Sequence, residues 1–231
     1  MQIAGSTKRA IVALENSRSL LVITADWMRQ KGNTEMADKA VELLSDAPDD
    51  WARKEREQDF PTVKRHSLIS MWGALEVAIE DTFVQILLND PFALASVFAL
   101  GVKGGKGHSV LTERDARMLY RRTESKLRHL PFAESLQQTL ASVGLKLIVR
   151  SHHATILAEV NEVRNTLLHR GGLIDSRAIS RVPSLARYEG TIFPISEDFF
   201  LKSFDGISSI VVSMMGAVGE YALSKHWVQH E

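Results

Sequence analysis

The pattern of hydrophobic and polar positions along the 231-residue chain is helical almost throughout. Apolar residues recur at intervals of three and four, which places them on one side of an α-helix. The clearest run extends from Pro61 to Asn89, and a second long run begins at Ser196. The apolar residues of the first run are Leu68, Met71, Trp72, Leu75, Ile79, Phe83 and Leu87. Because strand-like alternation is nearly absent, the pattern predicts an all-α, antiparallel helical bundle.

Two shorter helical runs precede Pro61. The first covers residues 6–29, and the second begins at Met36 and ends near Pro48. The charged segment 48–60 then predicts a solvated helix that leads to the next unit. We therefore divide the chain into an N-terminal helical extension, residues 1–60, and a main bundle, residues 61–231.

Polar and glycine-rich segments separate the later helices. The glycine-rich segment 101–109 departs from the Walker A pattern, so it predicts a flexible surface loop. Thr112 and Asp115 predict a capping box that opens a basic helix. A further helix is expected from Pro131 to about residue 147, and the long connection 173–195 predicts a loop with a short hairpin.

Charge and composition narrow the class of protein. Lys+Arg and Asp+Glu each number 28, so any affinity for nucleic acid or an anionic membrane must come from local charge. Such a surplus lies in residues 113–129, which hold six basic and three acidic residues and predict a solvated basic face. The absence of cysteine excludes disulfides, thiolate zinc sites and cysteine nucleophiles.

The hydropathy pattern predicts neither export nor a membrane span. The first 21 residues lack the continuous apolar core of a signal peptide. The apolar stretch 207–223 is shorter than the roughly 20 residues that a membrane span needs. We therefore expect a buried helix at this stretch and a cytoplasmic protein that does not bind a membrane.

The segment 163–172, with the sequence VRNTLLHRGG, holds the candidate chemistry. The helix that contains it is predicted to start at Ser151 as N-cap and to end at Gly171-Gly172, where glycine can adopt the left-handed conformation. Four apolar residues should face the core, namely Ile156, Val160, Val163 and Leu167. Asn165 and His169 lie on another side, with Arg164 at the margin, so the motif is expected on an accessible face.

Histidine and arginine are the residue types that cleavage of RNA through the ribose 2′-hydroxyl requires. A histidine can exchange protons with the reacting oxygens, and an arginine offers a planar fork of donors to the phosphate. The last turn of a helix also favours a positive charge. A purely structural interpretation stays open, in which Asn165 and His169 are surface residues and Arg164 pairs with Glu159, Glu162 or Asp198.

The run Arg164-Asn165-Thr166-Leu167-Leu168-His169, on a helix that ends in glycine and follows a helix containing LISMWGALEVAIEDTF, resembles the motif of the HEPN superfamily. The resemblance extends over residues 61–225, whereas residues 1–60 have no counterpart. It implies a helical bundle that forms a homodimer, with the two motif helices in a shared cleft. It also implies a metal-independent endoribonuclease, often the toxin of a toxin–antitoxin or phage-defence system.

The resemblance also implies roles for individual residues. Arg164 would bind and polarise the scissile phosphate, His169 would act as general acid/base, and Asn165 would orient them. Arg170 lies outside the family pattern, and an RNA-binding role for it is our own hypothesis. RNA is the implied substrate, no cofactor is implied, and an antitoxin or defence protein is a possible partner.

Three other interpretations bear on function. His152-His153 has no third ligand at metal spacing, so no metal site is expected. Glu76 and Glu80 either place a carboxylate near the motif or form a solvated stripe, and we favour the stripe. The alternative function is a HEPN-like module that binds RNA or a partner without cleavage. The neutral net charge favours that module, whereas the intact Arg–Asn–His set favours the enzyme.

Overall fold

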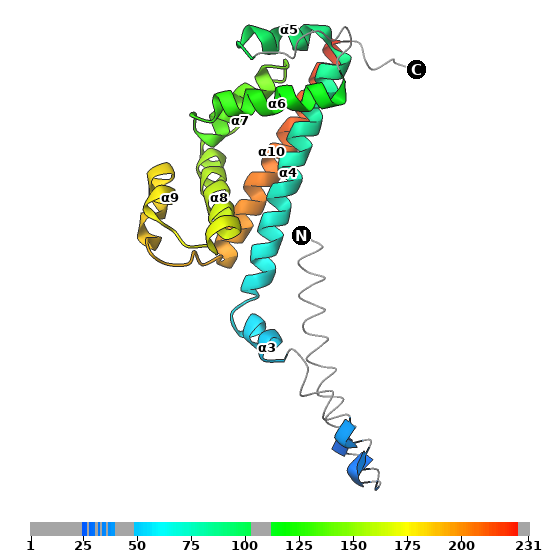
Figure 1. The fold of residues 1–231 in the computed structure, drawn as a ribbon, viewed down its shortest axis with the longest axis vertical. Helices are drawn as coiled ribbons and strands as arrows, with labels where there is room; N and C mark the ends of the chain where they lie inside the picture. Colours follow the sequence, from blue (N-terminus) through cyan, green and yellow to red (C-terminus); the bar gives the residue numbers. More distant parts are fainter. Residues whose placement is uncertain are drawn as a thin grey trace. The chain divides into compact units, whose positions relative to one another are not determined.

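The computed structural model describes residues 49–102 and 112–225, together with residues 25, 26, 28–30, 32, 34, 35 and 37–39. This part of the chain is helical apart from short connections and one isolated β-bridge, which confirms the all-α class (Figure 1). The helices are α3 (Asp49–Glu57), α4 (Pro61–Asn89), α5 (Pro91–Ala99), α6 (Glu113–Leu127), α7 (Phe132–Ala141), α8 (Ser151–Arg170), α9 (Ser176–Arg181) and α10 (Glu197–Ser224), with the 3₁₀-helix η1 (Pro183–Tyr188) between α9 and α10.

The contacts divide the chain into two compact units. Unit 1 comprises Met1–Ser67 and Pro194–Glu197, and unit 2 comprises Leu68–Phe193 and Asp198–Glu231. The two helices expected before Pro48 fall largely outside the described residues. The residues described between 25 and 39 are helical except for Gly32, which occupies a turn. The loop expected at 101–109 also lies outside the description, apart from its first two residues.

Buried charges hold the α3–α4 junction in unit 1. The Glu55 carboxylate accepts the backbone N–H of Thr62 at 3.1 and 3.2 Å, which satisfies a free donor in the first turn of α4. The buried Lys64 ammonium pairs with Asp59 and, at 3.0 Å, with Glu197. Burial opposes the charged form of Lys64, but the two carboxylates outweigh it and raise the pKa of Lys64.

Helix α4 supplies the surface on which α6 and α7 pack in unit 2. Trp72 is fully buried, and its ring centroid lies 4.9 Å from that of Phe132 on α7. Phe83 meets Tyr120 of α6 edge to face, at 5.4 Å. These aromatic contacts fix both helices against α4 through large apolar surfaces.

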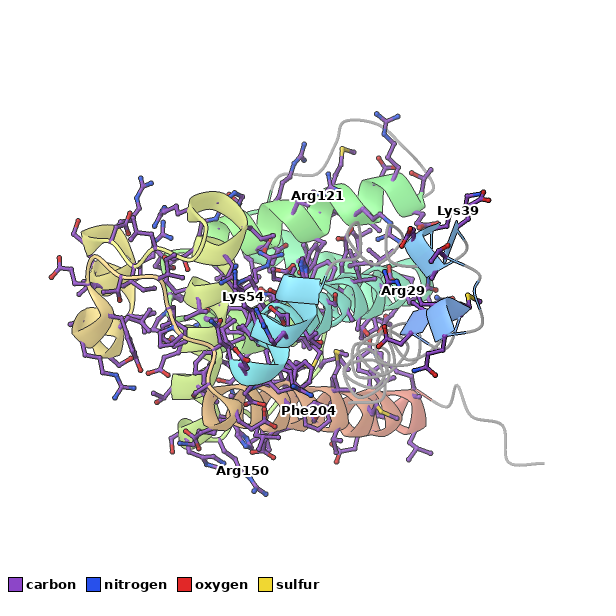
Figure 2. All side chains as sticks on the ribbon, turned by 90° about the horizontal axis from the view of Figure 1, so that it is seen from below. Arg29, Lys39, Lys54, Arg121, Arg150 and Phe204 are labelled. Atoms are coloured by element: carbon purple, nitrogen blue, oxygen red, sulfur yellow. The ribbon has the colours of Figure 1, made fainter. Side chains whose placement is uncertain are left out.

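The basic helix α6 agrees with its sequence pattern. Thr112 and Asp115 form the predicted capping box. Arg121 extends from the surface of the helix (Figure 2), as expected for a solvated basic face. Arg117 departs from this pattern, because it pairs with Glu80 at 3.0 Å and Asp81 at 2.8 Å, both on α4.

Helix α7 ends at Ala141, so the prediction of a helix to about residue 147 was wrong. Gly144 has φ +89°, a left-handed conformation that ends the helical path. A Cβ at this position would lie 2.8 Å from the ring of Tyr221. The chain then continues to α8 without helix or strand, with Leu145 and Leu147 buried.

Helix α10 is more exposed than the buried helix that the sequence predicts at 207–223. It covers 28 residues, and its most apolar stretch of 18 residues is only 28 % buried. The stretch 207–223 therefore belongs to a helix long enough to cross a membrane, and Val212 and Met215 are each 68 % exposed. One such helix among the described residues is weak evidence for a span, because core helices of soluble proteins also meet the criterion.

The connection after the motif is folded differently from the predicted hairpin. Its strand pairing is limited to one antiparallel bridge, between Leu173 and Ile192. The residues between them form α9 and η1 instead. The bridge therefore closes a short helical excursion, which returns the chain to Phe193 and the start of α10.

Candidate functional site

Helix α8 carries the motif and ends as its sequence predicts. Gly171 adopts the left-handed conformation, with φ 61°, and the N–H of Gly172 bonds the carbonyl of Thr166 at 2.9 Å. The start of the helix differs from the prediction. Ser151 is the first helical residue rather than the N-cap, and the N-cap, Arg150, makes no side-chain capping bond.

The two faces of α8 separate core packing from the motif. Leu157, Val160 and Val163 are fully buried. The side chain of Arg164 is 20 % exposed, and His169 lies exposed in the last turn. The motif is therefore on an accessible face, with the arginine stem partly buried beside the core.

A single cleft of about 1480 Å³ in unit 2 brings the predicted site residues together. Arg164, Asn165, His169 and Arg170 all line it. The other walls come from α4, from α6 and α7 with the turn between them, and from α9. The helical excursion after the motif therefore forms one side of the candidate site.

The cleft carries more positive charge than the chain as a whole. Its lining contains five arginines, three glutamates and two histidines. The arginines are Arg128, Arg164, Arg170, Arg177 and Arg181. Because Lys+Arg and Asp+Glu balance over the full chain, this local surplus favours an anionic ligand at the cleft.

Arg164 pairs with a carboxylate that the sequence pattern assigned to a solvated stripe. Its Nη2 lies 2.6 Å from Oε2 of Glu76, and its Nη1 donates to Oδ1 of Asn165 at 3.1 Å. The indole N–H of Trp72 donates to the other Glu76 oxygen at 3.0 Å. The stripe interpretation of Glu76 was therefore wrong, whereas Glu80 does not line the cleft.

The three pairings considered from sequence for Arg164 are replaced by other contacts. Glu159 accepts the hydroxyl of Ser184. Glu162 pairs with Arg181 at 3.2 Å. Asp198 pairs with Lys202 at 2.8 Å. Glu76 was not among those alternatives because it lies 88 residues before Arg164.

The donors of Arg164 are only partly used. Asn165 and Glu76 each take one hydrogen, on different Nη atoms, so each of these nitrogens keeps a second hydrogen. The Nε atom is buried and has no hydrogen-bond partner within the described structure. The donors that a ligand oxygen can reach are therefore the second hydrogens of the two Nη atoms.

Arg170 has a structural partner within the cleft. It pairs at 2.8 Å with Asp175, whose carboxylate also accepts the N–H of Ala178 at 2.9 Å and caps α9. The hydrogen bond from Ala178 and the charge of Arg170 lower the pKa of Asp175. Arg170 thus ties the end of α8 to α9, and its RNA-binding role stays a prediction.

Sequence reasoning missed several cleft residues, among them Arg128, His129, Arg177 and Arg181. Arg128 and Arg177 make no salt bridge to any residue in the described ranges. Nδ1 of His129 lies 3.0 Å from the carbonyl of Lys126, so it carries the hydrogen and leaves Nε2 unprotonated in the neutral ring. The basic composition of 113–129 was the available signal for Arg128 and His129. Arg177 lines the cleft only because the chain after the motif folds α9 against α8.

The acidic residues of the cleft are not grouped as a metal site. Burial raises the pKa of Glu124; nearby Arg128 opposes this, and the charges of Glu76 and Glu80 add to it. Among the residues that the structure describes, no group of three or more His, Asp or Glu side chains could hold a metal ion. His153, which lies outside the cleft, pairs with Asp205 of α10 at 3.0 Å.

Comparisons with known proteins leave the function to be argued from this cleft. The chain matches no family model, no curated protein and no solved structure. The resemblance to the HEPN superfamily accordingly depends on the motif from Arg164 to His169 and on its helical setting.

Proposed function

We propose that this protein is an endoribonuclease of the HEPN type, which cleaves RNA through the ribose 2′-hydroxyl. The observation that carries the proposal is the convergence of Arg164, Asn165 and His169 on one cleft that holds four further arginines. Its volume, about 1480 Å³, exceeds the roughly 300–1,000 Å³ typical of small-molecule sites, as expected for a polymeric substrate.

The reaction needs proton transfer at two oxygens and stabilisation of charge on the phosphate. One histidine takes the proton of the 2′-hydroxyl as its oxygen attacks phosphorus. A second, protonated histidine gives a proton to the 5′-oxygen as the P–O5′ bond breaks, which leaves a 2′,3′-cyclic phosphate. The free Nη hydrogens of Arg164 bind the non-bridging oxygens, where negative charge grows in the transition state.

A homodimer supplies the second histidine in this proposal. Two copies of α8 would face a shared cleft, so that each scissile phosphate meets both copies of His169. We propose that the protein is cytoplasmic and that its partner is an antitoxin or another defence protein. These features follow from the resemblance to the HEPN superfamily.

Incubation of the purified full-length chain with RNA in EDTA tests the proposal. We expect cleavage, with 2′,3′-cyclic or 3′-phosphate ends. Loss of cleavage in EDTA and its return with magnesium would contradict the mechanism. Tight binding of RNA without cleavage would instead support the non-catalytic binding module.

A further inference from the structure

We infer that Glu76 is a positioning residue for Arg164, an inference that rests on the proposed function. The carboxylate has a different donor at each oxygen. Oε2 binds Nη2 of Arg164 at 2.6 Å, and Oε1 accepts the indole N–H of Trp72 at 3.0 Å. Glu76 therefore connects the arginine of the motif to the core of the bundle.

The core end of this connection is rigid. Trp72 is fully buried, and its ring packs against Phe132 with centroids 4.9 Å apart. Trp72 and Glu76 lie one turn apart on α4, so the backbone of one helix sets both side chains. Site residues keep their geometry when supporting groups are locked by packing and hydrogen bonds.

The arginine end is held at two nitrogens. Nη2 binds Glu76, and Nη1 donates to Asn165 at 3.1 Å. Two directional bonds on different nitrogens fix the plane of the guanidinium and aim its remaining hydrogens. A phosphate then meets an oriented fork, and less freedom is lost when the transition state forms.

The same contact opposes substrate binding. The Glu76 carboxylate offsets the charge of Arg164 and repels an approaching phosphate. Glu76 should therefore weaken ground-state affinity while it improves orientation for catalysis. Removal of Glu76 is therefore predicted to raise substrate affinity while it lowers kcat, which removal of a merely structural carboxylate would not do.

Glu76→Gln tests this inference in the full-length protein. Both groups that bind Glu76 are donors, and an amide offers one oxygen, so glutamine can satisfy only one of them and turns an NH₂ toward the other. The Glu76 side chain is 45 % exposed, so the variant should fold. We expect kcat to fall about 10- to 100-fold, with KM unchanged or lower.

The chain offers a matched control one turn further along α4. Glu80→Gln removes a carboxylate that pairs with Arg117 at 3.0 Å and does not line the cleft. We expect its kcat and KM to equal those of the parent. Trp72→Phe keeps a ring but removes the N–H, so it should lower kcat in the same direction as Glu76→Gln by a smaller factor.

A binding measurement distinguishes failure of this inference from failure of the proposed function. An oligonucleotide with 2′-deoxy linkages has no nucleophile, so its affinity is measured without cleavage. Glu76→Gln should bind it more tightly than the parent does, and Glu76→Gln with Arg164→Ala should lose the gain. A parent that never cleaves RNA contradicts the proposed function, whereas this pattern of affinities would still support the Glu76–Arg164 coupling.

Two results overturn the inference. The first is a Glu76→Gln variant whose kcat and deoxy-oligonucleotide affinity equal those of Glu80→Gln. The second is a folded Glu76→Gln variant with a raised KM and an unchanged kcat, which would make Glu76 a binding group. Circular dichroism and thermal melting establish that each variant is folded.

Discussion

Two charge networks in unit 2 are built from similar groups but differ in how fully their polar atoms are satisfied. The first links Asp90, the N-cap of α5, to Tyr221 and Lys225 at the end of α10. The second links Glu76 to Arg164 in the cleft. Asp90 is 4 % exposed, whereas the Glu76 side chain is 45 % exposed.

The Asp90 network is saturated. The carboxylate accepts the hydroxyl of Tyr221, the ammonium of Lys225 at 2.8 Å and the N–H of Phe92 at 2.8 Å. Burial alone would raise the pKa of Asp90, but the bonds from Lys225, Tyr221 and Phe92 together lower it to about 2. All of these donors come from the protein itself, so the network contributes to stability.

The Arg164 network is open. Its guanidinium keeps hydrogens on both Nη atoms, its Nε has no described partner, and it faces a cleft. An unsatisfied cationic group gains little for the fold, but it is available to a ligand. The difference teaches that saturation, rather than the presence of an ion pair, separates a structural charge cluster from a candidate site.

The largest predicted effect follows from removal of the open side chains. Arg164→Ala and His169→Ala should each lower cleavage by about 10²- to 10⁴-fold, since each removes charge stabilisation or proton transfer. Both variants should keep the helicity of the parent. His169→Ala should also keep its melting temperature because His169 is exposed, whereas Arg164→Ala should lower it slightly because it removes a partly buried side chain and its bond to Glu76. Rate measurements and thermal melts check this.

A matched control for these variants is Arg121→Ala, which removes an exposed arginine outside the cleft (Figure 2). It should leave both activity and melting temperature unchanged. If Arg164→Ala or His169→Ala unfolds, the two networks do not differ as described, and the motif is structural.

Mixed dimers test whether the Arg164 network belongs to a site that two subunits share. Parental and His169→Ala subunits mixed in equal amounts should keep about a quarter of the parental activity, since only the quarter of dimers that hold two intact copies of His169 can cleave; sites that need one histidine from their own subunit would keep about half. Cleavage after subunit exchange measures this. A monomer that keeps full specific activity on dilution would refute the shared site.

The sequence anticipated the parts of this comparison that depend on local pattern. The apolar spacing of α4, the capping box at Thr112 and the end of α8 at Gly171 all follow from neighbouring residues. The early end of α7 involves contact between Gly144 and Tyr221, far along the chain. Such contacts between distant residues have no signature in a single sequence.

The residues of the candidate site also fall into those that the local sequence predicts and those that depend on distant contacts. The motif residues Arg164 and His169 were found because spacing along one helix is visible in the sequence. Glu76 and Arg177 were not assigned to the site, because their place depends on how α4 and α9 pack against α8. The partner of Arg164 is set by tertiary structure, so a pattern of i, i+4 glutamates predicted only a solvated stripe.

Removal of the saturated carboxylate should produce a large loss of stability and no specific loss of catalysis. Asp90→Ala leaves Tyr221 and Lys225 without their acceptor and removes the cap of α5. We expect a loss of about 2–4 kcal/mol, below the value for a fully buried pair because Lys225 is 34 % exposed. Urea denaturation measures it. A loss under about 0.5 kcal/mol would contradict the stabilising role.

The smallest predicted effect is that of one hydroxyl in the saturated network. Tyr221→Phe should cost about 1 kcal/mol near neutral pH, with kcat for RNA unchanged, because it removes one bond to the Asp90 carboxylate. A carboxyl whose pKa is lowered on folding stabilises the fold above its ordinary pKa of about 4, and this contribution is lost as the pH falls through about 2. The difference in unfolding free energy between the parent and Tyr221→Phe should therefore be complete above pH 4 and shrink toward pH 2. Urea denaturation at several acidic pH values measures that difference and cancels the titration of the other carboxylates. A difference that stays constant down to pH 2 would show that the hydroxyl acts through packing and not through the charge of Asp90.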